Sequence, residues 1–569
     1  MIIGIDLGTT NSLVAVWRDG QPQIIPNALG AFLTPSCVGM DEDGTVLVGE
    51  AARQRLQTHP DMTCALFKRY MGSDKVVRLG KQSMRPEELS SMVLRVLKAD
   101  AEAFLGHPVE EAIITVPAYF SDAQRKATRV AGQLAGLRVE RLVNEPTAAA
   151  LAYGIQDIQR ESKFLVFDLG GGTFDVSILE LFDGVMEVRA TAGDNFLGGE
   201  DFVTVLVDTF MLRSGLSKAM NDKVLDGGQR QRLRDEAERV KRALSTEPTA
   251  RMTFSYADQH FGWDLDEDSF AQLSEALMQR VRTPVERALR DATIKASELD
   301  TVVLAGGATR MPLVRKLAAR MFGRFPSVHL DPDHAIALGA AVQAGLKMRD
   351  AALEEVVMTD VAPYSMGISI SRQVGPSEFD PGHYLPIIER NSTVPVSRVQ
   401  NIATIFDNQH ELHVKIYQGE ARRVADNVFL GTLNFPIPPK KAGEIQADVR
   451  FTYDVSGVLE AEITVLPTQE KHKLVITENA GVMTPGEIER RLAELSALKI
   501  HPRDQMENRT LVARADRLYE QLLGDPREYL AAHVAAFQAV LEKQNPAETK
   551  RAREALAQAI ARLENGSYL

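Results

Sequence analysis

The sequence predicts an α/β protein of two similar lobes, followed by an antiparallel β domain and a short helical segment. Three observations lead to this prediction: an internal repeat in the first part, a change of hydrophobic period near residue 350, and a helix-start signature near residue 484. We therefore expect four parts. They are an α/β part over residues 1–353, a linker over 354–360, a β domain over 361–480 and helices over 481–569.

Length and composition limit what the chain can be. A chain of 569 residues is too long for a single domain with one hydrophobic core. Its 44% hydrophobic and 25% charged residues are typical of globular domains. A net charge of -12 argues against nucleic acid as a partner, because that affinity comes from clustered Lys and Arg. Cys37 and Cys64 lack a zinc-binding spacing and are expected to be buried thiols. The first residues carry no targeting signal and no later segment is apolar enough for a membrane, so we expect a cytoplasmic protein and, by default, a monomer.

The two-lobed prediction comes from an internal repeat. Short apolar runs alternate with helical patterns, and residues 5–16 have the same layout as residues 167–178. A second internal similarity relates residues 144–151 to residues 331–338, and each segment follows an expected strand and turn. We expect two lobes of similar design with a cleft between them.

Each copy of the repeat contains a turn suited to an anion. A strand ending in Asp-Leu-Gly-Thr-Thr lets backbone N–H groups approach phosphate, because Gly8 has no side chain and the threonines add donors. Asp6 and Asp168 end the two strands and are expected to face each other and hold hydrated Mg²⁺. One glycine-rich connection alone is more often only a tight turn. A third such turn, in residues 302–312, strengthens the interpretation that these turns bind phosphate. The sequence contains no P-loop motif that would offer another phosphate site.

The spacing of apolar residues along the sequence changes after residue 350. Residues 354–360 form a short apolar segment between acidic residues, which we interpret as a linker. From residue 361 to 477 apolar residues alternate with polar ones, which predicts an antiparallel β domain with one buried face. Thr484, Pro485 and Glu487 then give a helix start, and helices are expected almost to residue 569.

These motifs resemble the phosphate-1, phosphate-2 and adenosine motifs of the actin-like ATPases, a duplicated RNase H-like fold, in the form used by the 70-kDa heat-shock (DnaK-like) chaperones. The resemblance extends through residues 113–120, 144–150, 198–202 and 418–420, and covers roughly residues 1–480. The short nucleotide domain and short helical part are most similar to the bacterial HscC-type subgroup. The resemblance implies a β-sandwich and a shortened helical lid after the ATPase domain. It also implies an ATP-dependent chaperone, active in protein folding and stress response, that binds and releases hydrophobic peptide segments.

The resemblance also assigns roles in the nucleotide site. Lys68 would orient the attacking water and stabilise charge on the γ-phosphate, assisted by Glu145, Asp168 and Thr173; the cofactors would be ATP or ADP with Mg²⁺, held by Asp6 and Asp168 through water, and K⁺ as a further candidate. An exposed lysine and a solvated helix face are the alternatives for Lys68 and for residues 238–245. The other nucleotide contacts implied are Gly8, Thr9, Thr10, Asn11, Gly170, Gly171, Gly172, Gly198, Gly199, Glu200, Glu238, Lys241, Arg242, Ser245, Gly306, Gly307, Arg310 and Asp333.

Two further groups are implied for coupling and for peptide binding. Pro117 and Arg125 match a relay of nucleotide state, and Arg141 and Asp360 match the linker and J-domain contact region; a helix N-terminus and a surface ion pair are the alternatives. Because Leu412 replaces a smaller residue and Ile402 an aromatic one, we expect a shallow pocket and few clients. Plain core positions are the alternative for the whole peptide group, which comprises Ile368, Ile402, Ile405, Leu412 and Val414.

The implied partners are extended client peptides and a J-domain co-chaperone. The stretch over residues 69–89 is shorter than in typical members of the family, so dependence on a nucleotide exchange factor is left open. The short helical lid predicts fast exchange of bound peptide. Three other functions are compatible with a two-lobed ATPase. They are a small-molecule kinase, an actin-type filament and a regulator that binds ATP without a folding cycle. The first two give the β domain no role, and Lys68, Glu145, Asp168 and Thr173 argue for turnover against the third.

Overall fold

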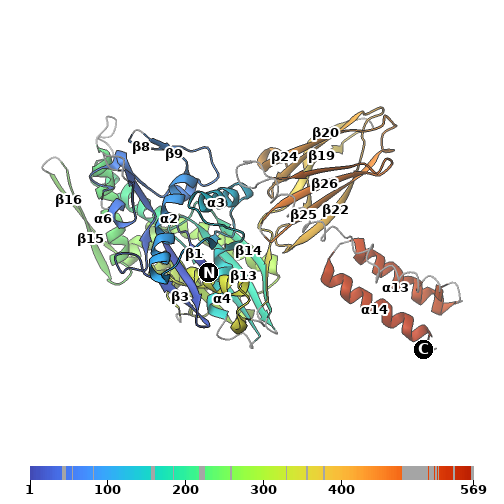
Figure 1. The fold of residues 1–569 in the computed structure, drawn as a ribbon, viewed down its shortest axis with the longest axis horizontal. Helices are drawn as coiled ribbons and strands as arrows, with labels where there is room; N and C mark the ends of the chain where they lie inside the picture. Colours follow the sequence, from blue (N-terminus) through green and yellow to red (C-terminus); the bar gives the residue numbers. More distant parts are fainter. Residues whose placement is uncertain are drawn as a thin grey trace.

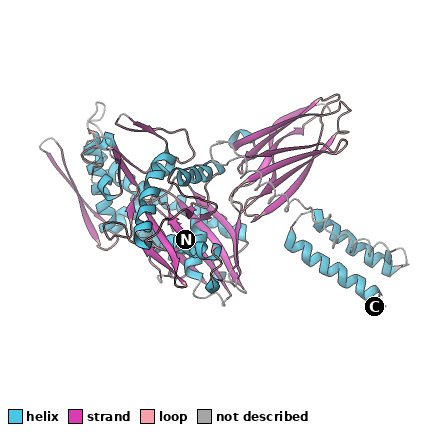
Figure 2. Ribbon diagram, in the orientation of Figure 1, coloured by secondary structure: helices cyan, strands magenta, loops and turns pink. Residues whose placement is uncertain are grey.

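The fold is shown in Figure 1, and Figure 2 shows that helices and strands mix in the N-terminal part while strands dominate the domain that follows. The computed structural model describes all residues except 41–45, 54, 81, 155–160, 183–184, 217–224, 257–258, 328–329, 354–356, 376–377, 456, 477–510, 512–514, 516–517, 520–521, 523, 543–544 and 565–569.

The first lobe contains a six-stranded sheet in the order β11-β10-β1-β2-β3, with β4 paired to β2. β1 and β2 form an antiparallel hairpin, and β10 runs parallel to β1. Both faces of β1 and β10 are buried, as expected where helices cover a sheet on both sides. The elements of this lobe are β1 (Ile2–Asp6), β2 (Asn11–Arg18), β3 (Gln21–Ile25), β4 (Thr34–Pro35), β5 (Cys37–Met40), β6 (Val46–Val48), α1 (Glu50–Arg53), η1 (Pro60–Met62), β7 (Thr63–Ala65), η2 (Phe67–Tyr70), β8 (Val77–Leu79), β9 (Gln82–Met84), α2 (Pro86–Leu105), β10 (Glu111–Val116), α3 (Asp122–Leu134), β11 (Leu142–Asn144) and α4 (Glu145–Gly154).

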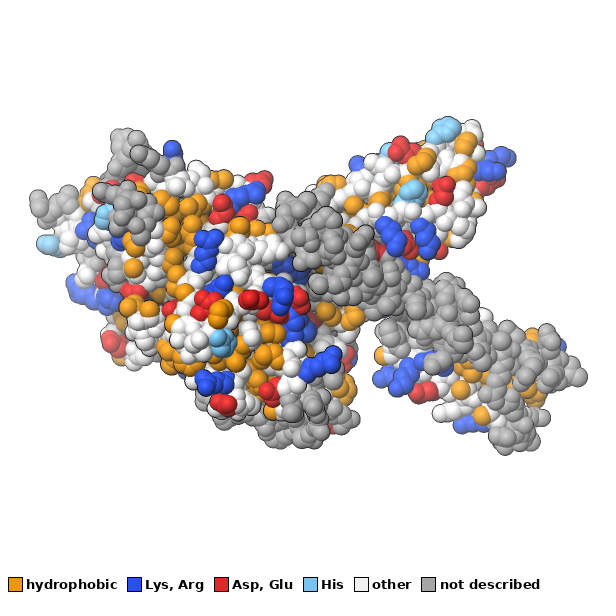
Figure 3. Space-filling model, in the orientation of Figure 1, with side chains coloured by type: hydrophobic (Ala, Val, Ile, Leu, Met, Phe, Trp, Pro, Cys, Tyr) orange, Lys and Arg blue, Asp and Glu red, His pale blue; other side chains and the backbone are white. Residues whose placement is uncertain are grey.

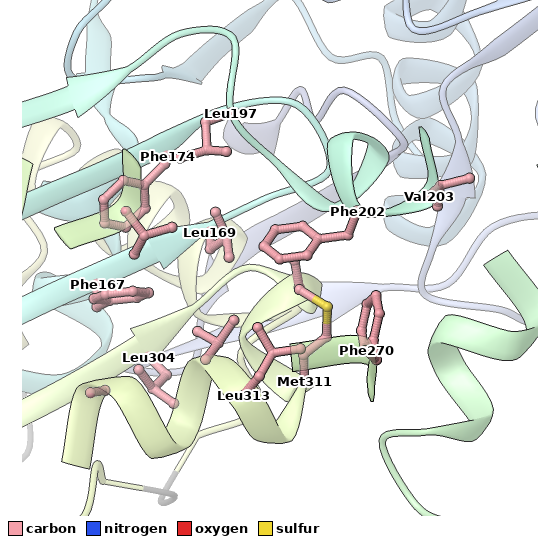
Figure 4. Packing of buried hydrophobic residues seen from close by; sticks show 14 of the residues in the cluster. Phe167, Leu169, Phe174, Leu197, Phe202, Val203, Phe270, Leu304, Met311 and Leu313 are labelled. Atoms are coloured by element: carbon pink, nitrogen blue, oxygen red, sulfur yellow. The ribbon is translucent and has the colours of Figure 1, made fainter. Parts of the chain in front are cut away.

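The second lobe repeats this plan. β12 and β13 form an antiparallel hairpin, β17 lies parallel to β12, and the sheet order is β17-β12-β13-β14-β18-β21. Its core packs Phe202 and Phe270 edge to face beside Met311 (Figure 4). The elements are β12 (Ser162–Leu169), β13 (Phe174–Phe182), β14 (Val185–Asp194), α5 (Gly199–Arg213), α6 (Gly227–Ala243), β15 (Thr249–Tyr256), β16 (Gln259–Asp266), α7 (Glu267–Leu273), α8 (Glu275–Ala292), η4 (Ala296–Glu298), β17 (Thr301–Ala305), η5 (Gly307–Arg310), α9 (Pro312–Phe322), α10 (Ala335–Lys347) and η6 (Ala351–Leu353).

Helices α4 and α10 join the two lobes by direct contact. A Cβ atom on Gly339 of α10 would lie 1.7 Å from the carbonyl oxygen of Ala148 in α4, so this approach requires glycine. On its other side α10 contacts β1, where a Cβ on Gly4 would lie 2.4 Å from the backbone of Ala340. The two helices belong to the two stretches that echo each other in the sequence, and they fix the position of each sheet relative to the other.

The β domain consists of two four-stranded sheets, in the orders β20-β19-β23-β24 and β22-β25-β26-β27, around a shared apolar core. Strand β18 leads into it and is shared: residues 357–359 pair with β14, and Asp360 and Val361 pair with β21. The elements are β18 (Val357–Val361), β19 (Met366–Gln373), β20 (Phe379–Ile388), β21 (Thr393–Val394), β22 (Val396–Ala403), β23 (Glu411–Gln418), η7 (Val424–Asp426), β24 (Val428–Pro436), β25 (Gln446–Tyr453), β26 (Leu459–Val465) and β27 (Lys471–Val475).

Two helices, α13 (Asp525–Glu542) and α14 (Pro546–Glu564), pack against each other near the C-terminus through Leu530, Phe537 and Ile560. The helix start expected at Thr484 lies outside the described residues. Across the described parts of the chain, no helix has both the length and the hydropathy needed to span a membrane. On the face drawn in Figure 3, Lys and Arg side chains lie among Asp and Glu side chains.

Candidate functional site

The site lies where the hairpin turns of the two lobes meet. A Cβ atom on Gly171 would lie 2.5 Å from the Thr10 side chain, and one on Gly172 would lie 2.7 Å from Thr9. The turns therefore touch only because these positions lack side chains. The N-terminus of α5 closes on the same place, where the N–H groups of Gly199 and Glu200 donate to the carbonyl oxygens of the second turn at 2.9 Å.

A buried ion pair lies beside these turns. Lys68 in η2 is 3% exposed, and its Nζ donates to Oε1 of Glu145, the first residue of α4, at 2.8 Å. Asp6 at the end of β1 accepts from Thr115 Oγ1 at 3.2 Å. Both Asp6 and Asp168 feel the charges of Glu145 and Lys68, so the structure brings these four predicted residues into one buried cluster.

The carboxylates of this cluster are buried near one another, which disfavours their charged forms. Burial, and next the charge of Glu145, raise the pKa of Asp6 to about 7 and that of Asp175 to about 8. The same two causes raise the pKa of Asp168. A cation in this place would favour the charged forms of all three.

The carboxylates fit a hydrated cation better than a directly ligated one. Asp168 Oδ2 and Asp175 Oδ2 are buried and have no hydrogen-bond partner among the described residues. Those residues hold no group of three or more His, Cys, Asp or Glu side chains placed to bind a metal directly. Mg²⁺ usually keeps several waters and uses one or two carboxylates, so Asp6 and Asp168 could hold it through water.

Residues expected to hold ribose and adenine gather on the second lobe. In α6, Lys241 is buried; its Nζ donates to the Gly199 carbonyl at 3.2 Å and forms an ion pair with Glu238 Oε2 at 2.5 Å. Arg242 donates to the other oxygen of Glu238 at 2.6 Å, and the Ser245 hydroxyl donates to the carbonyl of Lys241. These contacts order α6 against the start of α5.

The third glycine turn lies at η5. Gly306 has φ +78°, and a Cβ atom there would lie 2.4 Å from the Leu169 carbonyl oxygen, so the turn fits against β12 only as glycine. Arg310 donates two hydrogen bonds to Asp333 at 2.7 and 3.1 Å, and a Cβ on Gly307 would lie 2.7 Å from an oxygen of the same carboxylate. The remaining predicted residues lie in the first two turns and at the start of α5. Gly8 donates its N–H to Ser12 Oγ, and the carbonyl of the buried Thr173 accepts from the Gly170 N–H. Gly198 caps α5 beside Gly171.

Two of the four predicted coupling residues, Arg125 and Asp360, meet at Asn144, which directly precedes Glu145. Arg125 donates to Asn144 Oδ1 at 2.7 Å, and Asn144 Nδ2 donates to Asp360 Oδ2 at 2.9 Å. Burial lowers the pKa of Arg141, and the charge of Asp360 opposes this. The Pro117 carbonyl accepts from the Phe120 N–H in the turn before α3. The linker strand is thereby connected to Asn144, the residue that directly precedes Glu145.

The predicted peptide residues have a different environment. Ile368 in β19 and Leu412 and Val414 in β23 are buried in the core of the β domain. Ile402 in β22 packs half-buried against that core, and Ile405 is half-buried after the strand. A role of these residues in peptide binding stays a prediction.

Sequence reasoning missed three residues that the structure joins to the site. Asp175 lies directly opposite Asp168 in the β12–β13 hairpin, where the first copy of the repeat has Leu13. An aspartate within an otherwise apolar strand was the available signal. No such local signal marks the other two residues. Asn144 forms a bridge to Asp360, and the Tyr119 N–H donates to Asp175 at 3.0 Å.

A comparison with protein families matches two overlapping segments of the chain. The family described as Hsp70 protein matches residues 2–78 and 75–567, and the two matches meet within the short stretch over residues 69–89. Members of this family are ATPases and ATP-dependent chaperones that bind ATP or ADP with Mg²⁺, client peptides and J-domain proteins. Because the matched segments cover nearly the whole length, this chain belongs to the Hsp70 family.

Proposed function

We propose that this chain couples ATP hydrolysis in its two-lobed domain to the binding and release of extended hydrophobic segments by its β domain. The observation that carries the proposal is the contact chain from Glu145 to the shared strand β18. Asn144, next to Glu145, bonds both Arg125 and Asp360, and Asp360 lies in the strand that the two domains share.

Hydrolysis requires a held triphosphate and a positioned water. The glycine turns supply N–H groups for the phosphates, and Lys68, fixed by Glu145, supplies a buried ammonium for the charge that develops on the γ-phosphate. Mg²⁺ would neutralise charge between the phosphates and the carboxylates of Asp6 and Asp168. In this proposal, Glu145 accepts a hydrogen bond from the attacking water once Lys68 turns toward the phosphate.

The β domain is docked on the ATPase domain through a second set of contacts. Arg390, between β20 and β21, donates to both carboxylate oxygens of Asp291 in α8, at 2.8 and 3.0 Å, and to Glu420 at 2.6 Å. Asn391 donates to Asp291 and accepts from the Thr191 N–H of β14. Polar contacts of this kind between domains can break when the lobes rotate.

The test is the dissociation rate of a fluorescent hydrophobic peptide from the full chain loaded with ADP, before and after ATP is added. We expect ATP to accelerate release. The Lys68→Ala variant should still release the peptide on ATP addition, but its return to slow release should be delayed, because we expect it to hydrolyse ATP much more slowly. Peptide binding with no response to ATP would contradict the coupling, and absence of peptide binding would contradict the chaperone cycle.

We also propose that the chain is a specialised member with a narrow client range, of the HscC type. The sequence expectation that Leu412 replaces a smaller residue and Ile402 an aromatic one supports this proposal. A peptide-array profile as broad as that of a general folding chaperone would refute it.

A further inference from the structure

Tyr119, in the turn between β10 and α3, is held at its two ends by different parts of the chain. Its N–H donates to Asp175 Oδ1 at 3.0 Å. Its carbonyl oxygen accepts from the Tyr364 hydroxyl at 2.8 Å and from the Asn195 side chain at 2.7 Å. A single residue therefore contacts the nucleotide site on one side and the β domain on the other.

The Asp175 end belongs to the catalytic cluster. Asp175 is 1% exposed and lies opposite Asp168 across the hairpin. The charges of Glu145 and Lys68 both act on it, and its Oδ2 has no hydrogen-bond partner among the described residues. The Tyr119 N–H donates to its other oxygen, so a shift of Tyr119 changes the position of this carboxylate.

The Tyr364 end belongs to the β domain. Tyr364 lies between β18 and β19, and its ring centroid is 4.4 Å from that of Tyr119 at an interplanar angle of 45°. Burial raises the pKa of Tyr364, so its hydroxyl stays protonated and can donate. The guanidinium of Arg287 in α8 lies 5.6 Å from the Tyr119 ring, which adds a contact from the second lobe.

We propose that Tyr364 is a positioning residue through which the docked β domain sets the place of Tyr119 and, through Tyr119, the place of Asp175 in the nucleotide site. The inference rests on the proposed function, because it requires the β domain to dock and undock during the nucleotide cycle. When the domain leaves, Tyr119 loses a ring contact and a hydrogen bond together, and the donor to Asp175 is free to move.

The first test is hydrogen exchange of the Tyr119 amide in the full-length Tyr364→Phe variant. This change removes the hydroxyl and keeps the ring, so we expect the Tyr119 amide to exchange roughly two- to tenfold faster, as for the loss of one hydrogen bond. Tyr384→Phe is the matched control, since the Tyr384 hydroxyl donates to the Tyr417 carbonyl within the β domain. An unchanged rate in Tyr364→Phe, or an equal rise in the control, would overturn the proposal.

The second test is steady-state ATP hydrolysis with and without a hydrophobic peptide. We expect the ratio of stimulated to unstimulated kcat to fall toward one in Tyr364→Phe. The KM for ATP should stay within about twofold of wild type, because the Tyr364 hydroxyl donates to Tyr119 and not to a residue of the phosphate turns. An unchanged ratio overturns the inference while the proposed function stands. If the wild-type protein shows no coupling, the proposed function fails, and the exchange rate of the Tyr119 amide still decides whether Tyr364 positions it.

Discussion

At the scale of single residues, we expect the removal of the Lys68 side chain to separate ATP hydrolysis from ATP binding. Lys68→Ala leaves Glu145 buried without its 2.8 Å partner, so we expect the free energy of unfolding to fall by about 3–5 kcal/mol. Single-turnover hydrolysis should slow about 10²–10³-fold, as for loss of a preorganised charge. The double variant Lys68→Ala/Glu145→Gln should recover stability in urea unfolding but not hydrolysis. Lys98→Ala, at a half-buried lysine of α2, is the control; hydrolysis at the wild-type rate in Lys68→Ala would refute the assignment.

The raised pKa of Asp175 predicts how the free energy of unfolding depends on pH. Its pKa is about 8 in the folded protein and 3.8 ordinarily, so the folded state keeps a proton that the unfolded state releases. Without nucleotide and metal, the free energy of unfolding should therefore fall as pH rises from about 4 to about 8, by up to about 1.4 kcal/mol per pH unit. Urea unfolding of Asp175→Asn should show a shallower fall, and Asp268→Asn, at an exposed position, the wild-type fall. Equal slopes in all three proteins would contradict the raised pKa.

At the scale of elements, strand β18 connects the two domains. Asp360 is half-buried, with hydrogen bonds to Asn144 and to the Val361 N–H, and it feels the charges of Arg125 and Arg141. Asp360→Asn keeps the shape and removes the charge, so we expect peptide to stimulate ATP hydrolysis less, with the ratio of rates falling toward one.

Thr359→Val is the matched control for that variant, because neighbouring residues of a strand point to opposite faces. Steady-state hydrolysis with and without peptide gives the measurement. A wild-type ratio in Asp360→Asn, or an equal loss in Thr359→Val, would show that the charge at this position does not transmit the signal.

Much of the α/β part could be predicted because its signals are local. A strand that ends in Asp6 and turns at Gly8, repeated at Asp168 and Gly170, predicts two hairpins, and both are present. The strand at β18 could not be predicted, since its partners β14 and β21 are far away in the sequence. The same reason hides the role of Asn144, which depends on a partner 216 residues away.

At the scale of the whole molecule, Arg390 is the contact whose loss should undock the β domain without damage to either domain. Its guanidinium forms two hydrogen bonds to Asp291 in the ATPase domain, and its other partner, Glu420, is in the β domain. Bidentate pairs of this kind are stronger than ordinary surface ion pairs, so their removal shifts a docking equilibrium appreciably. In Arg390→Ala we expect the acceleration of peptide release by ATP to fall toward one, while peptide affinity in ADP stays near that of wild type.

Arg423→Ala tests whether this effect depends on the contact between domains. Arg423 also forms two hydrogen bonds to one carboxylate, that of Asp380, but both residues lie within the β domain. Stopped-flow release of a labelled peptide should therefore respond to ATP as in wild type. If Arg390→Ala keeps the full acceleration, the docked arrangement does not control the grip on peptide. If both variants lose it, the effect comes from a damaged β domain. Loss in Arg390→Ala alone would mean that the energy of ATP binding reaches the peptide through the position of one domain on the other.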